Sequence, residues 1–242
     1  MVDISVIILN YNTFQLTCEC IASVYEQTNG ISFEIIIVDN GSKECNPDLF
    51  KGAFPAVKLI KNNTNVGFAK GNNIGLQHAS GKTVLLLNSD TKLLNNALLF
   101  AFERLLKDPH AAAITGKVVY PHGEPQHVAQ NFPSIPLLLS EIFRLYRFIP
   151  KNKWGEIYAA HYFNYEQELY PDWIWATFFL IRREAISLLP GGKFPEDFFM
   201  YVEDKLWCYY LMKLGYKFIY SPLPRIVHYV AASTNDAKDF RN

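Results

Sequence analysis

Four short apolar runs near the start of the sequence place the strongest constraint on the fold. They lie at residues 4–10, 33–39, 56–62 and 82–88. Runs such as ISVIILN and KTVLLLN are continuously apolar, as expected for strands that are buried on both faces. Segments with helical spacing of apolar residues separate them, at 13–28, 67–79 and 95–108. Thr13 is the predicted N-cap of the first of these helices. Strands that alternate with such helices predict an α/β fold with a mostly parallel central sheet flanked by helices.

The rest of the chain has a less regular pattern, but no linker divides it. Segment 173–189 predicts a strand that runs into a helix at Arg183. Segment 203–222 predicts a helix, a glycine C-cap at Gly215 and a short strand. No internal repeat or low-complexity segment interrupts the sequence. We therefore expect a single domain over residues 1–242.

Polar residues directly follow three of the four buried runs. They are Asn10, Tyr11 and Asn12 after the first run, Asp39 and Asn40 after the second, and Asn88, Ser89 and Asp90 after the fourth. In open parallel sheets, ligands bind outside the carboxyl ends of the strands. Each position alone is equally well explained as a turn residue. Three such groups at one edge of a sheet predict one binding site.

Charge and glycine spacing disfavour several functional classes. The chain carries 23 Lys and Arg against 23 Asp and Glu, so its charge gives no reason to expect nucleic-acid binding. The glycines of VGFAKGNNIG follow the third run with spacing G-x-x-x-G-x-x-x-G, unlike the dinucleotide fingerprint, and no P-loop is present. A Rossmann dehydrogenase and a P-loop NTPase are thus disfavoured. A nucleotidyltransferase also lacks support, because no loop rich in Gly, Arg and Lys follows the first run.

The remaining sequence signals predict a soluble, intracellular protein. The N-terminus lacks a basic region followed by a signal-peptide cleavage site, and no uncharged apolar run reaches the ~18 residues of a membrane span. The four cysteines form no Cys-x-x-Cys pair, so reduced thiols packed as small apolar groups are expected.

Six short motifs give the chain a resemblance to a known family. They are VIILNYN, IIIVDNGS, NNTNVGFAKGNNIG, LLLNSDT, FFLIRREA and FFMYVED with MKLGYK. In this order they resemble the family 2 inverting glycosyltransferases of the GT-A fold, a Rossmann-like fold of nucleotide-diphospho-sugar transferases. The resemblance covers residues 4 to about 233 and is strongest to the bacterial rhamnosyltransferase-like branch, which builds surface polysaccharides. It implies a donor half at 1–120 and an acceptor half at 121–242.

The resemblance implies a nucleoside diphosphate sugar as the sugar donor. Asp39 matches the aspartate that accepts hydrogen bonds from the nucleobase, and Leu9 and Tyr11 match the walls of the base pocket. The loop that closes over the nucleoside is implied at Gly67, Phe68 and Asn73.

The resemblance also implies a divalent cation, Mg²⁺ or Mn²⁺, that neutralises the diphosphate leaving group. The family's Asp-x-Asp-like motif reads Asn88-Ser89-Asp90 here, so Asp90 is its only carboxylate. One aspartate is enough, because Mg²⁺ is often held by one or two carboxylates together with substrate phosphates and water. His228 matches a histidine that completes the metal shell; the alternative is a hydrogen-bonded core residue.

The catalytic base is implied at Asp204, with Glu203 beside it, because they match the family's Glu-Asp pair. An inverting displacement needs one carboxylate to accept the proton of the acceptor hydroxyl. The alternative is that both acids merely favour a helix N-terminus through the macrodipole. That alternative does not explain the aromatic run FFMY ahead of the pair.

The chain departs from the family pattern on the acceptor side. An aspartate and an arginine of the branch are Leu206 and Tyr210 here, and a Gly-Ala pair is Ala176-Thr177. A Phe-Asp-Glu motif is Phe194-Pro195-Glu196. These changes affect acceptor identity more than activity. They also leave an alternative function open, a donor-binding but catalytically weak partner subunit of a glycan-assembly complex.

The acceptor implied by the branch is a hydroxyl of a glycan or of a lipid-linked glycan. Segment 132–150, with Arg144, Arg147, Lys151 and Lys153 in or after it, suits peripheral contact with the inner face of the cell membrane. Its alternatives are packing on the core or on a second subunit of a homodimer. Trp173 and Trp175 suit either an acceptor cleft or the core.

Overall fold

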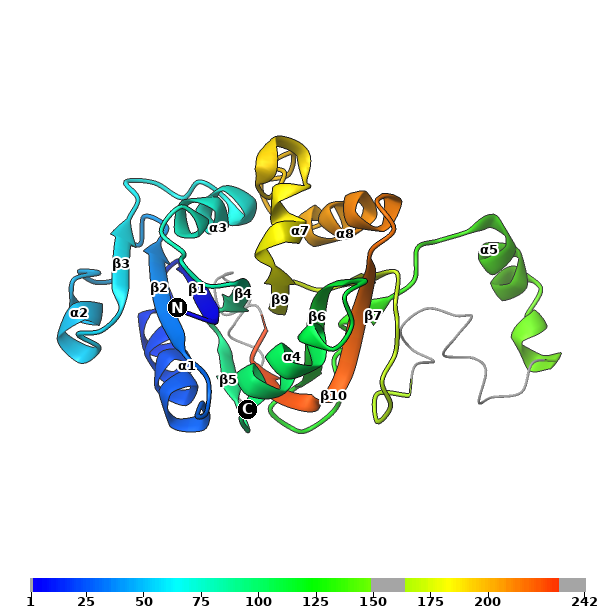
Figure 1. Ribbon diagram of the computed structural model, residues 1–242, viewed down its shortest axis with the longest axis horizontal. Coiled ribbons are helices and arrows are strands. Elements are labelled where there is room, and N and C mark those ends of the chain that lie inside the picture. Colours follow the sequence, from blue (N-terminus) through cyan, green and yellow to red (C-terminus); the bar gives the residue numbers. More distant parts are fainter. Residues whose placement is uncertain (1, 149–163, 231–242) are drawn as a thin grey trace.

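The central sheet of the computed structural model has eight strands, and the structure describes residues 2–148 and 164–230 (Figure 1). The strand order is β3-β2-β1-β4-β9-β6-β10-β5. The first four by position are β3 (Lys58–Lys61), β2 (Phe33–Asp39), β1 (Ile4–Asn10) and β4 (Thr83–Asn88). They are parallel to one another, as their apolar runs predict, and the interior positions of β1, β2 and β4 are buried. The α/β prediction is confirmed.

The register of these strands gathers their polar ends at one edge. Asn10 of β1 pairs with Asp39 of β2, and Leu9 of β1 pairs with Asn88 of β4. Because all three strands end at the same level, the residues that follow them face one space. The polar residues that follow these strands therefore gather at one edge of the sheet, as the sequence predicts.

The other half of the sheet mixes strand directions. It consists of β9 (Phe178–Arg182), β6 (Ala111–Val119), β10 (Lys217–His228) and β5 (Thr91–Leu93). β9 is antiparallel to both of its neighbours, β4 and β6, whereas β6 and β10 are parallel. The alanine-rich start of β6 carries little strand propensity, which explains why the sequence pattern did not reveal this strand.

The prediction of a short strand within 203–222 is wrong about its length. β10 extends through Pro222 and Pro224 to His228, with a register irregularity against β6 between Tyr220 and Arg225. Proline lacks a backbone N–H and is tolerated in sheets at such irregularities. As a result, His228 pairs with Thr91 of β5 and reaches the same edge as Asp90.

Helices cover both faces of the sheet. The α-helices of the described residues are α1 (Phe14–Gln27), α2 (Leu49–Ala53), α3 (Phe68–Leu76), α4 (Ala97–Leu106), α5 (Ile135–Ile142), α7 (Arg183–Ser187) and α8 (Glu203–Lys213). Of these, α5 lies apart from the sheet (Figure 1). α1 and α4 lie on one side, and α3 and α8 lie on the other (Figure 1). Thr13 is the N-cap residue of α1 by position, but its hydroxyl makes no capping bond, since it contacts Asn10 and Ser89 instead.

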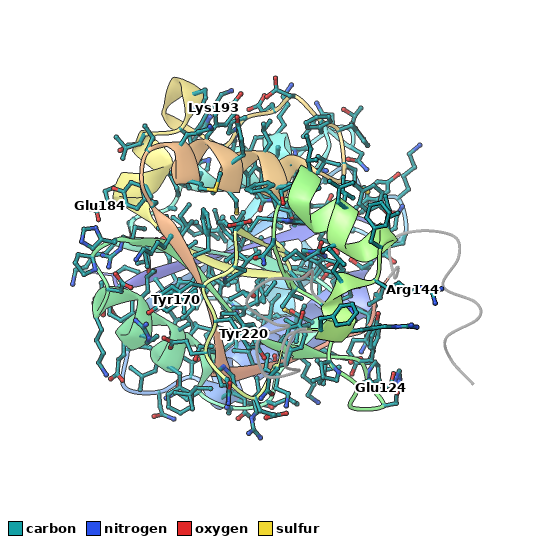
Figure 2. The ribbon with its side chains drawn as sticks, turned by 90° about the vertical axis from the view of Figure 1, so that its right-hand side faces the viewer. Glu124, Arg144, Tyr170, Glu184, Lys193 and Tyr220 are labelled. Carbon is teal, nitrogen blue, oxygen red and sulfur yellow. The ribbon has the colours of Figure 1, made fainter. Side chains whose placement is uncertain are left out.

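The segment that includes α5 has unusually exposed apolar side chains. Ile135 and Ile142 of α5 are 74% and 71% exposed, and Phe148, in the short 3₁₀ helix Leu145–Phe148, is 85% exposed. Figure 2 shows Arg144 at the periphery of the molecule and Tyr220 within its body. Residues 149–150, Lys151 and Lys153 lie outside the described residues. Among the described residues, no helix is both long enough and apolar enough to cross a bilayer.

Candidate active site

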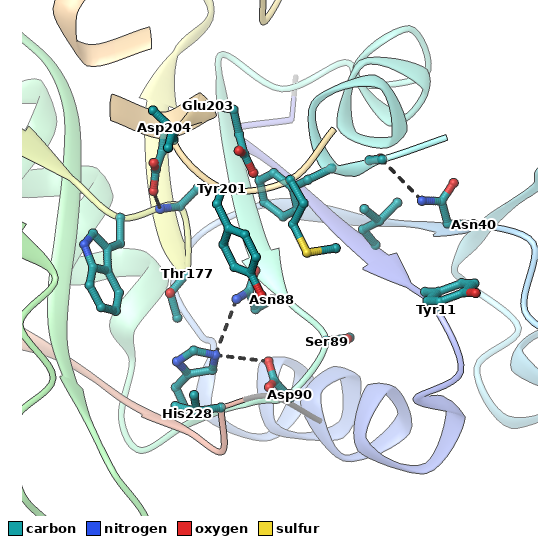
Figure 3. Close-up of a pocket in the computed structure, with 18 of the residues that line it drawn as sticks. Tyr11, Asn40, Asn88, Ser89, Asp90, Thr177, Tyr201, Glu203, Asp204 and His228 are labelled. Atoms are coloured by element: carbon teal, nitrogen blue, oxygen red, sulfur yellow. Dashed lines mark hydrogen bonds and ion pairs between the residues drawn. The ribbon is translucent and has the colours of Figure 1, made fainter. Parts of the chain in front are cut away.

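One cavity of about 650 Å³ opens at the carboxyl edge of the sheet. It brings together ten of the residues that the sequence assigned to catalysis, donor binding or metal binding: Leu9, Tyr11, Gly67, Phe68, Asn88, Ser89, Asp90, Glu203, Asp204 and His228. Tyr11 and Asn40 lie at one end of the cavity and Asp204 at the other, with Asn88 between them (Figure 3). The cavity therefore has two distinct ends, one formed after β1 and β2 and one formed at the start of α8.

A buried polar network fixes the edge where β1 ends. The Asn10 side chain donates to Oδ1 of Asp39 at 2.8 Å and accepts from Thr13 and Thr17 at 3.1 and 2.8 Å. The Thr13 hydroxyl is 3.0 Å from the Ser89 hydroxyl. Because Asp39, Thr13, Thr17 and Ser89 are all buried, breaking one of these bonds leaves a polar group without water, which is costly. The network thus holds β1, β2 and the 88–90 turn in a fixed relation.

Two of the predicted donor residues lie behind the cavity lining. Asp39 is 2% exposed, and its other oxygen accepts from the Ser42 backbone at 3.2 Å. Asn73 is 4% exposed and bonds the backbone of Phe194 and the Glu196 carboxylate. Asn73 therefore ties α3 to the 194–196 loop, and its contact with a nucleoside remains a prediction.

The sequence places Asn40 in the polar group that follows β2 but predicts no specific contact for it. Its side-chain oxygen accepts from the Val66 backbone and from Asn62, both at 3.1 Å. Its amide donates to Asn65 at 2.8 Å. Asn40 and Asn65 both line the cavity, so this cluster shapes the loop that precedes Gly67. The position of Asn40 directly after a strand is the sequence feature that indicates its place at the site.

Asp90 and His228 form the most compact pair in the cavity. Nε2 of His228 lies 3.2 Å from Oδ1 of Asp90 and 3.4 Å from the Asn88 amide (Figure 3). Nδ1 of His228 lies 2.8 Å from Oε1 of Gln126. The Gln126 amide nitrogen donates to the His228 carbonyl oxygen at 2.8 Å, which orients Oε1 as an acceptor. Nδ1 is therefore the protonated nitrogen, and a neutral His228 turns the lone pair of Nε2 toward Asp90.

This pair suits a divalent cation. A lone pair that faces a carboxylate oxygen is unfavourable unless a proton or a cation lies between them. The described residues contain no group of three or more His, Cys, Asp and Glu that would enclose an ion. Mg²⁺, however, needs only one or two protein ligands when substrate phosphates and water complete its shell. Asp90 and His228 are therefore a ligand set that fits a shared cation.

At the other end of the cavity, Asp204 lies half-buried in the first turn of α8. Its Oδ2 accepts from the Ala176 backbone at 3.0 Å, and its Oδ1 accepts from the Lys205 backbone at 2.8 Å. Burial raises the pKa of Asp204, while these backbone hydrogen bonds lower it in part. A carboxylate with a raised pKa is a stronger base than one with an ordinary pKa, as a general base requires.

Glu203 beside it is 6% exposed and also lines the cavity. Burial raises the pKa of Glu203, and the neighbouring charge of Asp204 adds to the effect. Its Oε2 has no hydrogen-bond partner. A carboxyl group in this setting favours the neutral form, so the two adjacent acids differ in their surroundings.

The segment 198–202 leads into α8 over the cavity and has a strained backbone. Tyr201 and Val202 have φ values of 69° and 70°. This left-handed region is unusual for a β-branched residue such as valine. The Phe68 N–H donates to the Phe199 carbonyl oxygen at 2.9 Å, and a Cβ at Gly67 would lie 2.5 Å from that oxygen. Gly67 therefore allows the segment to approach α3, and Met200, Tyr201 and Val202 line the cavity.

Residues of the predicted acceptor half also line the cavity. Trp173, Trp175, Ala176 and Thr177 line it together with Lys205. Both tryptophans line the cavity and also pack in part against the core, and their contact with an acceptor remains a prediction.

Comparison with known proteins adds independent evidence. A family model described as Glycosyl transferase family 2 matches residues 5–187. The N-acetylglucosaminyl-diphospho-decaprenol L-rhamnosyltransferase of Mycobacterium tuberculosis is 26% identical over 212 residues, which is 83% of this chain and 67% of that protein.

Solved structures share the fold at lower identity. A mannosyltransferase of Pyrobaculum calidifontis, solved with GDP-Man and Mn²⁺, has a TM-score of 0.64 at 20% identity and covers 96% of this chain. GalNAc-T7, solved with UDP, GalNAc and Mn²⁺, has a TM-score of 0.68 at 16% identity and covers 95%. The chain spans 58% and 43% of these two longer chains.

Proposed function

The chain belongs to glycosyl transferase family 2, whose model matches residues 5–187, and has the predicted GT-A fold; we propose that it transfers one sugar from a nucleoside diphosphate sugar to a glycan or lipid-linked glycan hydroxyl. The anomeric centre is inverted in this proposal. Its setting is bacterial surface polysaccharide synthesis, in line with the name of the mycobacterial relative. Residues 1–120 hold the sugar donor, and residues 121–242 hold the acceptor and contribute His228 to the donor end.

The observation that carries the proposal is one cavity lined by both Asp90 and Asp204. Asp204 is the base: its carboxylate takes the proton of the acceptor hydroxyl as that oxygen bonds to the anomeric carbon and the bond to the diphosphate breaks. Its raised pKa supports this role. Glu203 assists as the second member of the acidic pair. Leu9, Tyr11, Asp39, Gly67, Phe68, Asn73, Asn88 and Ser89 form the donor site of this proposal.

Asp90 and His228 are the proposed ligands of Mg²⁺ or Mn²⁺. The bound cation supplies positive charge that stabilises the diphosphate leaving group. The fit of the pair supports this assignment, because a cation satisfies both the carboxylate and the Nε2 lone pair. Mn²⁺ in two structural neighbours agrees with it.

A panel of nucleotide sugars tests the proposal. Thermal shift with Mn²⁺ identifies the sugar donor, and release of the nucleoside diphosphate with and without glycan acceptors measures turnover. We expect turnover with Mg²⁺ or Mn²⁺ and its loss in EDTA. Binding of a sugar donor that is never consumed would instead favour the partner-subunit alternative.

Two finer predictions belong to the same proposal. The exposed apolar side chains of Ile135, Ile142 and Phe148, with Arg144 and Arg147 among them, support peripheral contact with the cytoplasmic face of the membrane. The same surface also suits a homodimer. Vesicle flotation with anionic lipids, and light scattering of the protein alone, separate these two arrangements.

A further inference from the structure

The ammonium group of Lys205 lies against two aromatic rings at the Asp204 end of the cavity, and the proposed mechanism does not use it. Nζ of Lys205 is 5.3 Å from the ring centroid of Trp173 and 5.9 Å from that of Phe132. Lys205 and Trp173 both line the cavity. An ammonium group over an aromatic face keeps its charge and still has N–H groups to donate.

Both residues have unused hydrogen-bonding capacity. Among the described residues, Lys205 is the one Lys or Arg that lines the cavity, and no carboxylate lies within ion-pair distance of its Nζ. The indole N–H of Trp173 is buried without a hydrogen-bond partner. A buried donor without a partner is costly and calls for an explanation, for which a ligand is one answer.

We propose that Lys205 and the Trp173 indole N–H bind an anionic group, phosphate or carboxylate, carried by the acceptor. The proposal rests on the function proposed above. Asp90 and Asp204 also line the cavity, so their negative charges disfavour an anionic acceptor unless a cation compensates for them. A neutral acceptor would need no such cation.

The position of the two residues assigns them to the acceptor and not to the sugar donor. Lys205 directly follows Asp204, and Trp173 lies three residues before Ala176, whose N–H donates to Asp204. Tyr11 and Asn40 lie at the opposite end of the cavity (Figure 3). An anion bound here lies next to the base, where the acceptor hydroxyl must be.

The indole N–H resonance of Trp173 provides a test that does not require turnover. The probes are N-acetylglucosamine 1-phosphate and methyl glucuronide, with their neutral methyl glycosides as references, all in EDTA so that no metal binds phosphate. The resonance is assigned with Trp173→Phe. We expect it to shift with one or both anionic probes and not with the neutral ones, and the two anionic probes distinguish phosphate from carboxylate.

Lys205→Met should weaken that binding about tenfold or more, because hydrogen bonds to charged groups contribute that much. Lys213→Met is the matched control: Lys213 lies on the same helix, with its Nζ 5.4 Å from the Tyr209 ring, but outside the cavity lining. It should bind the probes as the unchanged protein does. A purely structural Lys205 would lower the thermal midpoint and leave the anionic preference intact.

Two results would overturn the inference: no Trp173 shift with either anionic probe, or the same shift in Lys205→Met. Once a transferred sugar is known, Lys205→Met should raise the KM for charged acceptors and leave the KM for the sugar donor unchanged. If Lys205→Met instead raised the KM for the sugar donor, the anion bound by Lys205 would be the diphosphate of the donor. Absence of turnover with every sugar donor would contradict the proposed function without changing the binding result.

Discussion

Nε2 of His228 lies 3.2 Å from Oδ1 of Asp90, although the two residues are far apart in the sequence. Antiparallel pairing of β10 with β5 creates this contact, since His228 is in register with Thr91, the residue after Asp90. Gln126 fixes the other ring nitrogen at 2.8 Å. Three separate segments of the chain therefore meet at the proposed metal site.

Replacing the carboxylate of this pair should remove the cation. We expect Asp90→Asn to lose Mn²⁺ binding and to lower kcat/KM by about 10²-fold or more, because a neutral amide is a weak ligand for a hard cation. Calorimetric titration with Mn²⁺ measures the affinity. Asp48→Asn, which changes an exposed aspartate paired with Lys61, should have no effect on either quantity. Full activity of Asp90→Asn in Mn²⁺ would remove the role given to Asp90.

Gln126 should tune the metal site without touching the cation. Gln126→Leu leaves Nδ1–H of His228 without its acceptor, so the ring loses its fixed tautomer and orientation. Loss of such an outer partner typically costs about 10-fold to 100-fold in metal affinity. The ¹⁵N chemical shifts of His228 report the tautomer directly. Unchanged shifts together with unchanged Mn²⁺ affinity would show that Gln126 only fills space.

The proposed role of Asp204 as the base predicts a specific dependence of the rate on pH. Asp204→Asn should lower kcat by roughly 10²-fold to 10⁴-fold and keep the affinity for the sugar donor. In the unchanged protein, the base must be ionised, so the rate falls as the pH falls through the pKa of Asp204. Because burial raises that pKa, the acid limb should lie above the ordinary value of 3.8. A pH profile of single-turnover rates at saturating sugar donor measures it, and an acid limb at or below 3.8 would contradict the assignment.

Gly67 should be required for the segment 198–202 to close over the cavity. In Gly67→Ala, the new Cβ meets the Phe199 carbonyl oxygen at 2.5 Å in a backbone with φ of 88°. We expect a loss of stability of about 1–3 kcal/mol and a raised KM for the sugar donor. Gly123→Ala has a similar φ of 94° and no atom within 4 Å, so it isolates the backbone cost. If the two substitutions lowered stability equally, the close approach of Gly67 to the Phe199 carbonyl oxygen would not be important.

Away from the cavity, Glu34 should make folding stability depend on acid pH. Burial raises the pKa of Glu34, but hydrogen bonds from Lys58, Ser5 and Ser80 outweigh it and lower the pKa to about 2. A depressed acidic pKa stabilises the fold above the ordinary value of 4.5 and loses that contribution as the pH falls toward 2.

Glu34→Gln should therefore cost about 1–2 kcal/mol at neutral pH, and the difference should shrink below pH 4.5. Urea unfolding from pH 7 to pH 3 measures it. Glu124→Gln, at a side chain that is 78% exposed, is the control. If the difference in unfolding free energy did not change with pH, the effect of Glu34→Gln would come from packing and not from charge.

The elements read most directly from the sequence were the buried parallel strands. β1 and β2 have the bounds of the runs 4–10 and 33–39, because a strand covered on both faces is continuously apolar and ends where polar residues begin. β6 escaped detection, because three alanines begin it and its neighbours, not its own residues, make it a strand.

The site was predictable where its residues end strands or belong to a motif. Leu9, Asn88 and Asp204 were found this way, and all three line the cavity. Gln126 carried no signal, because its role comes from a contact with His228 across the sheet edge. The left-handed backbone of Val202 also had no signal, since nothing in a valine predicts a positive φ.

The sequence by itself determined the α/β class, the parallel strands and the edge at which polar residues gather. These properties follow from local hydrophobic pattern and chain order. Only the tertiary structure decided which polar groups meet there: Gln126 with His228, Ala176 with Asp204, and Lys205 with Trp173. The reason is physical, because strand register and the packing of α8 set distances between residues that no local pattern connects.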